Sequence, residues 1–310
     1  MYLRTIIAIM LAVFFTVDAV SELKPKISWG LTGNESGITD FRSRTLATGK
    51  PYAEAAGLHV NQIGDPELSW EKTSQINAGI DIGLFNDRIL LEYQYYKKKT
   101  TDLLLNRPVP GSTGFTGVLS NIGEMENQGH EFSLNATILD GEFSWTSTLN
   151  VATLYNEVTK LYQEQPIDAG FVSRVSVGEE LGAFYVFETT DNDGDGTILD
   201  ENGDVEYNDR NGDGVINDDD KYFAGSPMPD ISGNFRNTFS YKGLSLSANF
   251  NFKSGNDMYN NTRAFAGASG ASIFSKLEDE IDDYWTEEVY LKVNQLFSFY
   301  SIGIQMILYH

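Results

Sequence analysis

The sequence predicts an all-β fold whose antiparallel strands form part of a transmembrane β-barrel. Apolar and polar side chains alternate over stretches of about ten residues, near the length of a membrane-spanning strand. The stretches come in pairs joined by very short turns, and long polar segments separate the pairs. A period of two places one set of side chains on each face of a sheet. Short turns on one side and long loops on the other are typical of a barrel wall.

The same alternation locates the individual strands. The expected strands lie near residues 26–31, 73–84, 89–99, 130–138, 142–155, 234–241, 244–253 and 290–300. Their connections run alternately long and short, so every short turn falls on the same side of the sheet. Residues 182–187 are expected to form a further strand or a loop hairpin inside the longest connection, and the tail 296–310 is a candidate for one more strand, for a total of about eight to ten. Residues 274–288 are expected to form a short amphipathic helix in an outer loop.

A soluble β-sandwich is the alternative, because its strands also alternate. Three details favour the membrane. The strands are longer than the usual five or six residues, and their polar positions are largely uncharged, which suits a wetted lumen. Aromatic residues such as Phe85, Phe143 and Tyr241 gather at strand ends, where an interfacial girdle would lie.

Composition excludes several kinds of function. The 310 residues include no cysteine and only three histidines, which removes disulfides, cysteine-bound zinc and most histidine-based catalysis. The formal net charge of −22 argues against nucleic acid as a partner. Paired carboxylates occur anywhere in so acidic a chain and carry little information, so we predict no catalytic residues and no enzyme. Residues 191–220 hold twelve Asp and Glu but one basic residue, Arg210, so the charge has a local cause.

The chain divides into three parts by composition. Residues 1–21 resemble a signal peptide, with Arg4 before an apolar run; a chance apolar stretch after a start inside a longer gene is the alternative. Residues 22–310 carry the barrel strands. An acidic insertion at 190–222 is expected to lie in an outer loop.

The acidic insertion contains the pattern of a twelve-residue calcium loop. Such a loop needs oxygen ligands at positions 1, 3, 5, 7, 9 and 12, with glycine at position 6 for the sharp turn. The predicted ligands are Asp209, Asn211, Asp213, the Val215 carbonyl, Asn217 and Asp220. Ile216 at position 8 is expected to point into the fold. Calcium is the preferred ion because all these ligands are hard oxygens.

Two further interpretations of this region stay open. A second, weaker metal site would use Asp191, Asp193 and Asp195, which begin the same pattern. The alternative for both is a solvated acidic loop with turn glycines, since Asp, Asn and Gly are common in loops. Calcium would have a structural role, offsetting the repulsion between the acids.

Five segments, in order, resemble elements of TonB-dependent outer-membrane receptors of the SusC/RagA type. They are residues 28–34 (SWGLTGN), 64–71 (GDPELSWE), 108–115 (PVPGSTGF), 121–129 (NIGEMENQG) and 225–230 (GSPMPD). The resemblance extends from about residue 22 to 300, and its ordered motifs are more specific than any single one.

The resemblance implies a nutrient transporter in the cell outer membrane, with periplasmic turns and extracellular loops. Such receptors import oligosaccharides or peptides, pair with a SusD-like surface lipoprotein and take energy from the TonB complex. The chain would correspond to the middle-to-late part of the barrel. Nothing in it resembles the plug or a TonB-contacting segment, so we do not expect energised transport from this chain alone. A secreted calcium-binding β-sandwich, as an adhesin or a carbohydrate-binding module, is the alternative function.

Overall fold

The computed structural model describes residues 19–51, 55–190, 205–261, 296–298 and 301–309. The chain divides into two compact units. The wall unit comprises Met1–Gln165, Asp230–Ser254 and Tyr300–His310, and the loop unit comprises Pro166–Pro229 and Gly255–Phe299.

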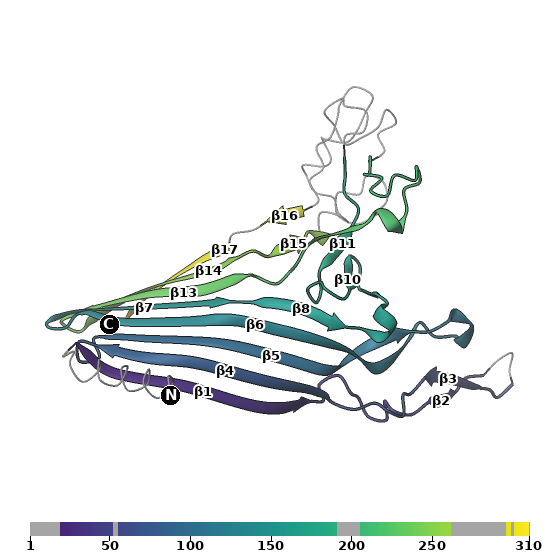
Figure 1. Ribbon diagram of the computed structural model, residues 1–310, viewed down its shortest axis with the longest axis horizontal. Helices are drawn as coiled ribbons and strands as arrows, with labels where there is room; N and C mark the ends of the chain where they lie inside the picture. Colours follow the sequence, from purple (N-terminus) through teal and green to yellow (C-terminus); the bar gives the residue numbers. More distant parts are fainter. Residues whose placement is uncertain (1–18, 52–54, 191–204, 262–295, 299–300, 310) are drawn as a thin grey trace, which may run out of the picture. The chain divides into compact units, whose positions relative to one another are not determined.

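The wall unit is built on one antiparallel sheet (Figure 1). Its strands lie in the order β1-β4-β5-β6-β7-β13-β14-β17, and β8 also pairs with β6. Their bounds are β1 Val20–Asn34, β4 Glu71–Leu84, β5 Ile89–Pro108, β6 Gly117–Leu139, β7 Phe143–Thr153, β8 Tyr155–Lys160, β13 Ile231–Tyr241, β14 Leu244–Ser254 and β17 Ser301–Tyr309. Among the described residues β1 and β17 are the two edges, so the sheet does not close.

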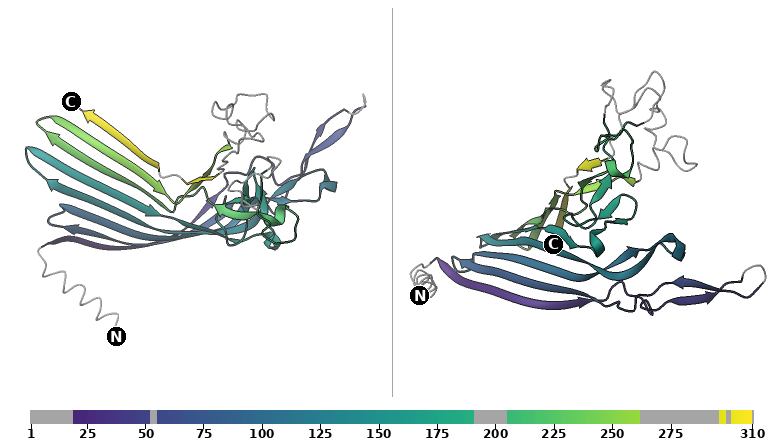
Figure 2. Two further views of the ribbon diagram at one scale, coloured as in Figure 1. Left: turned by 90° about the horizontal axis from the view of Figure 1, so that it is seen from above. Right: turned by 45° about the vertical axis from the view of Figure 1, so that its right-hand side comes forward.

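The predicted short turns all lie at one end of this sheet (Figures 1 and 2). The β13–β14 turn is Lys242-Gly243, with φ of 46° and 87°. Positive φ at both central residues is the conformation whose twist matches antiparallel strands, and glycine adopts it without strain. The β4–β5 turn has positive φ at Phe85, Asn86 and Asp87. The alternation of short and long connections is therefore confirmed.

The structure corrects several predicted boundaries. Strands β5 and β6 continue well beyond the expected 89–99 and 130–138. Of the strand expected at 290–300, the structure describes only β16, Leu296–Ser298, which pairs with β15 in the loop unit and not with the wall; the rest of that prediction lies outside the described residues. The tail supplies β17 instead. Val20 and Ser21, which fall in the signal-like segment, belong to β1, and the helix expected at 274–288 lies outside the described residues.

Smaller elements of the wall unit escaped prediction. Strands β2 (Leu46–Gly49) and β3 (Leu58–Gln62) form a separate hairpin, and β8 follows β7 after one residue. The described part of the unit also contains two 3₁₀ turns, η1 (Gly111–Thr113) and η2 (Tyr162–Glu164). Each is too short to produce a periodic signal.

The loop unit carries a four-stranded sheet in the order β12-β11-β10-β9. Its strands are β9 Ile167–Ala169, β10 Ser173–Val175, β11 Phe184–Val186 and β12 Tyr222–Gly225. β11 confirms the strand expected at 182–187. β15 (Asp257–Tyr259) pairs with β16, and η3 (Asp218–Asp220) closes the acidic loop.

Buried apolar side chains lie away from the middle of the long strands. In the wall unit the described ones are Leu103, Val118, Val158 and Leu161, and in the loop unit Ile167, Val175, Ala183 and Phe184. Strands β4, β7, β13 and β14 contribute none of these described core residues. None of the helices in the described part of the chain is long and apolar enough to span a membrane.

Candidate functional site

One face of the wall sheet is apolar and open. The strand registers place Ile80 beside Tyr93, Tyr93 beside Phe132, and Phe132 beside Val151. The apolar residues continue on the edge strand, where Ile27 is 79% exposed and Trp29 71% exposed. Aromatic rings pair across strands on the same face, as in Trp145 with Phe239 and Phe235 with Phe250. So large an exposed apolar surface is typical of a face that contacts an apolar partner or the hydrocarbon of a membrane.

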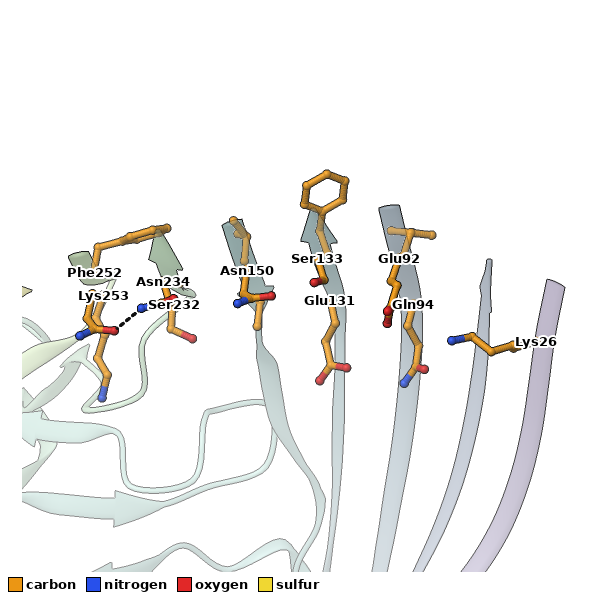
Figure 3. Close-up of a pocket in the computed structure, with 16 residues that line it drawn as sticks. Lys26, Glu92, Gln94, Glu131, Ser133, Asn150, Ser232, Asn234, Phe252 and Lys253 are labelled. Carbon is orange, nitrogen blue, oxygen red and sulfur yellow. Dashed lines mark hydrogen bonds between the residues drawn. The ribbon is translucent and has the colours of Figure 1, made fainter. Parts of the chain in front are cut away.

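The opposite face is polar and hollowed. A hollow of about 660 Å³ extends across β1, β5, β6, β7, β13 and β14. The side chains of Glu92, Gln94, Glu131 and Lys253 extend to this side of the sheet (Figure 3). The other polar residues that line it are Lys26, Ser133, Asn150, Ser232, Asn234 and Asn251.

Hydrogen bonds and one ion pair order this polar face. Lys26 Nζ lies 2.5 Å from Asp81 Oδ1. Asn234 Nδ2 donates to Asn249 Oδ1 at 2.6 Å and to Asn251 Oδ1 at 2.8 Å. The bond to Asn251 is the dashed line beside Asn234 in Figure 3. Carboxylates lie on β5 and β6, amides on β7 and β13, and Lys253 on β14. The face therefore offers donors and acceptors to a polar solute or to water.

Glu71 joins three strands at the far end of the sheet from the short turns. Its Oε2 accepts a hydrogen bond of 2.8 Å from Asn34 Nδ2 on β1, and its Oε1 accepts one of 3.0 Å from the Leu104 N–H on β5. A carboxylate that accepts bonds from both sides fixes the register of its neighbours.

Asn121 makes a second link at this end. It binds both backbone groups of Ser69, since Oδ1 accepts from the Ser69 N–H at 2.7 Å and Nδ2 donates to the Ser69 carbonyl at 2.8 Å. Nδ2 also donates to the Asp102 carbonyl at 2.6 Å. Asp102 has φ of 59°, at the irregularity in the β5–β6 register. Three of the sequence motifs, at 28–34, 64–71 and 121–129, thus meet in one hydrogen-bonded network.

The predicted calcium loop folds around Asp209. Its Oδ1 accepts hydrogen bonds from the N–H groups of Gly212 and Asp213, and its Oδ2 accepts one of 2.7 Å from Gly214. Gly214 has φ of 80°, the left-handed conformation expected of the sixth loop position. Asn211 and Asp213 each accept the N–H two residues later, at 2.8 Å.

Asp220 closes the loop from its other end. It is fully buried. Its Oδ1 accepts from the N–H groups of Arg210 and Asn211, and its Oδ2 accepts from Asn217 at 2.8 Å. Asn217 in turn caps η3 by accepting from the Asp219 N–H at 2.9 Å. Asp220 therefore holds the two ends of the loop backbone together.

The metal prediction remains a prediction. The six predicted ligands do lie in one loop, but the carboxylates of Asp209, Asp213 and Asp220 are engaged with backbone N–H groups. Within the described ranges no three Asp, Glu or His side chains form a group that could hold a metal ion. Ile216, expected to point into the fold, is 44% exposed, so that prediction is wrong. Asp191, Asp193 and Asp195 lie outside the described residues.

Among the described residues of the loop unit, Glu188 and Asp218 have lowered pKa values. Hydrogen bonds from Asn208 and then Arg210, which lies 2.7 Å away, lower the pKa of Glu188. A hydrogen bond from Lys221 lowers the pKa of Asp218. Both pairs tie the acidic loop to its basic neighbours, and the Arg210 guanidinium also lies over the Tyr222 ring at 4.6 Å.

Comparison with known proteins identifies the sheet. Residues 36–251 match the family model described as TonB dependent receptor-like, beta-barrel. The chain belongs to this family. Its wall is thus part of a transmembrane β-barrel, antiparallel and with short turns at one end, as the alternation predicted.

Relatives agree with the family. The TonB-dependent receptor P26 of Formosa agariphila is 35% identical over 87% of this chain, and the receptor SusC of Bacteroides thetaiotaomicron is 32% identical over 78%. A solved structure of the RagAB peptide transporter matches 91% of the chain with a TM-score of 0.71 and 28% identity. This TonB-dependent receptor chain spans less than a third of each relative's length (29%, 26% and 32%).

The polar face was not predicted as a site. Glu92, Glu131 and Lys253 each stand at an ordinary polar position of an alternating strand, far apart in the sequence. Only the cross-strand register brings them to one hollow. The alternation shows which positions of each strand are polar, and this was the available signal. The pairing register is also needed to show which polar positions of neighbouring strands lie next to each other.

Proposed function

We propose that the protein acts in nutrient import across an outer membrane, as barrel wall of a receptor. The two-sided sheet carries this proposal: the apolar face suits lipid, and the polar face suits a wetted lumen. A secreted adhesin or carbohydrate-binding module would need polar side chains on the outer face. The exposed apolar rows therefore favour the receptor.

We propose an oligosaccharide or a peptide as the substrate. The amides and carboxylates of the polar face suit either class, since both form hydrogen bonds, and the RagAB peptide transporter is similar to this chain. A SusD-like surface lipoprotein would bind on the side of the long loops. The TonB complex would supply energy to the assembly without contacting these residues.

Transport requires a closed barrel in lipid. In the described sheet, β1 and β17 each pair on one side, and every unpaired backbone group is costly in the hydrocarbon. We therefore propose that both edges are paired in the working assembly. We propose import and not catalysis, because the polar face offers solvated contacts rather than an enclosed reactive centre.

Fractionation of cells that produce the protein tests the location. We expect the protein in the outer-membrane fraction, extractable only with detergent. Recovery in the soluble periplasm would contradict the proposal. A second test is loss of uptake of one polar nutrient class when the gene is deleted, measured with oligosaccharides and peptides as separate carbon sources; unchanged growth on both would argue against import.

A further inference from the structure

The apolar face of the wall changes character along β5 and β6. On β6, Leu134 and Phe132 are followed on the same face by His130, then Gln128, then Glu126. On β5, Leu91 is followed by Tyr93, Tyr95 and Lys97. Apolar side chains thus give way to rings and then to ions, which is the order from hydrocarbon through the interface to water.

The rings at this boundary form one cluster. The Tyr93 hydroxyl lies 2.8 Å from His130 Nδ1, and the two rings are stacked with centroids 5.9 Å apart. The Tyr95 ring lies 5.4 Å from the His130 ring, and its hydroxyl donates to Gln128 Oε1 at 3.1 Å. The imidazole is exposed, and among the described residues its side chain makes a hydrogen bond only through Nδ1, which leaves Nε2 available.

A pocket of about 530 Å³ lies at this level. The wall divides there: β7 makes its last pair with β13 at Thr153 and Ile231, while β8 continues beside β6. By strand alternation the side chains that line the pocket from the apolar face are Tyr95, Gln128, His130, Thr153, Tyr155 and Ile231. Tyr155 is 51% exposed at its rim.

Gly129 and Thr153 build the back of this pocket. The Thr153 carbonyl packs against Gly129 so closely that an added Cβ would lie 2.0 Å from it. Thr153 Oγ1 accepts from the His130 N–H at 3.0 Å. These contacts hold the dividing point open in one geometry.

The charges above the pocket are mutually neutralised. Lys97 pairs with Glu126 at 2.6 Å, and Glu124 pairs with Lys99 at 2.8 Å and Lys160 at 3.2 Å. These lysines are therefore occupied, and a phosphate would have to displace a carboxylate. Phenol, imidazole and amide groups together with an exposed ring suit uncharged hydroxyls, which both donate and accept.

We propose that this pocket binds the sugar headgroup of a glycolipid in the outer leaflet, with the acyl chains along Phe132 and Leu134. The inference rests on the proposed outer-membrane location and adds a specific lipid class to it. Binding a headgroup at the division of the wall stabilises the end of β7 against β13.

Photo-crosslinking in cells tests the proposal. A photoreactive amino acid replaces Tyr155 at the pocket, Leu134 in the apolar band, or Leu244 beside the β13–β14 turn, and lipid adducts are identified by mass. We expect a sugar-bearing adduct at position 155, lipid adducts at position 134 and phospholipid alone at position 244. If position 134 gives lipid adducts but position 155 gives no sugar-bearing adduct, the proposed headgroup site is wrong. If neither position 134 nor position 244 gives a lipid adduct, the proposed membrane location is wrong instead.

A substitution sharpens the test. His130→Phe keeps the ring stack but removes the free imidazole nitrogen. Loss of one hydrogen bond should lower the yield of the sugar-bearing adduct at position 155 by roughly three- to tenfold. The lipid adduct at position 134 reports that the variant is folded and inserted. An unchanged yield at 155 would contradict a headgroup site at His130.

Discussion

The strand wall and the acidic loop at 205–225 keep their shapes by different means. In the wall the backbone ladder sets the order, and the long strands β4, β7, β13 and β14 contribute none of the described buried apolar residues. In the loop, side chains set the order, because Asp209 and Asp220 each accept three backbone N–H groups. In the wall, the effect of a substitution on stability should therefore depend on which face of the sheet it occupies. In the loop, it should depend on whether one of these carboxylates is lost.

The largest expected effect is on the wall backbone itself. Gly129→Ala would place a Cβ 2.0 Å from the Thr153 carbonyl and 2.8 Å from the Tyr96 hydroxyl. Because a carbonyl of the neighbouring strand cannot move aside cheaply, we expect a loss of about 3 kcal/mol or more. The measurement is the amount of folded protein in the outer membrane. Gly30→Ala is the control, since nothing lies within 4 Å of its added Cβ; equal losses would refute the explanation.

Substitution by arginine compares the two faces at one depth. Phe235→Arg places a charge on the apolar face and should cost about 2–4 kcal/mol near the bilayer midplane. Asn234→Arg, one residue earlier on the polar face, loses two hydrogen bonds but leaves its charge in water, so it should cost less, about 1 kcal/mol. Both are measured as urea midpoints after insertion into lipid vesicles. If the two variants lose the same stability, the assignment of lipid and lumen faces is wrong.

In the loop, Asp220→Asn removes the charge that holds three backbone N–H groups. Hydrogen bonds to a charged group contribute about 1.5–3 kcal/mol, so the loop should open locally. Limited proteolysis between residues 205 and 221 should accelerate while the wall stays intact. The exposed neighbour Asp219, changed to Asn, is the matched control and should be cleaved at the wild-type rate.

Calcium binding by Asp209–Asp220 stays a prediction that the same assay can test. At ten times a dissociation constant of about 10⁻⁴–10⁻³ M, a bound ion would stabilise the loop by about 1.4 kcal/mol. Calcium should then slow cleavage, and a chelator should restore it. Asp213→Asn should reduce the protection. Equal cleavage rates with and without calcium would contradict this prediction and indicate that the loop is held by its own hydrogen bonds alone.

The smallest effect concerns acid. The folded-state pKa of Glu188 is lowered by Asn208 and Arg210, so its contribution is present above the ordinary pKa of the group and is lost as the pH falls through the lowered value. Because the side chain is exposed and screened, the effect should be slight. A dye attached at Val215→Cys in this cysteine-free chain should report loosening below about pH 4.5. Glu188→Gln should remove that pH dependence. If the transition persists in this variant, a group other than Glu188 causes it.

Alternation predicted the wall because one face of each strand meets a different environment from the other. It located β4, β7, β13 and β14 to within a few residues. It missed the outer extensions of β5 and β6, where pairing continues beyond the expected ends, from Leu103 with Gly123 to Pro108 with Gly117. The calcium-loop pattern placed Ile216 inside, because a loop pattern does not say which neighbours the loop meets.

The polar hollow and the pocket at His130 could not be predicted, and the reason is the same for both. Glu92, Glu131 and Lys253 become neighbours of one hollow only through the register of several strands, and a shift of one residue would move each to the other face. The links from Glu71 to Asn34 and from Asn121 to Ser69 help to set that register. The motifs that carry these residues were visible in the sequence, but their partners were not.

The strict alternation of the strands also bears on secretion. A translocation channel in the inner membrane retains segments of about twenty consecutive apolar residues. Strands such as β13 and β14 interrupt every apolar side chain with Asn, Ser, Thr or another polar or small residue over most of their length, so none of them forms such a segment. If the protein acts in the outer membrane, as we propose, the pattern that suits that membrane also lets the same strands pass through the inner one.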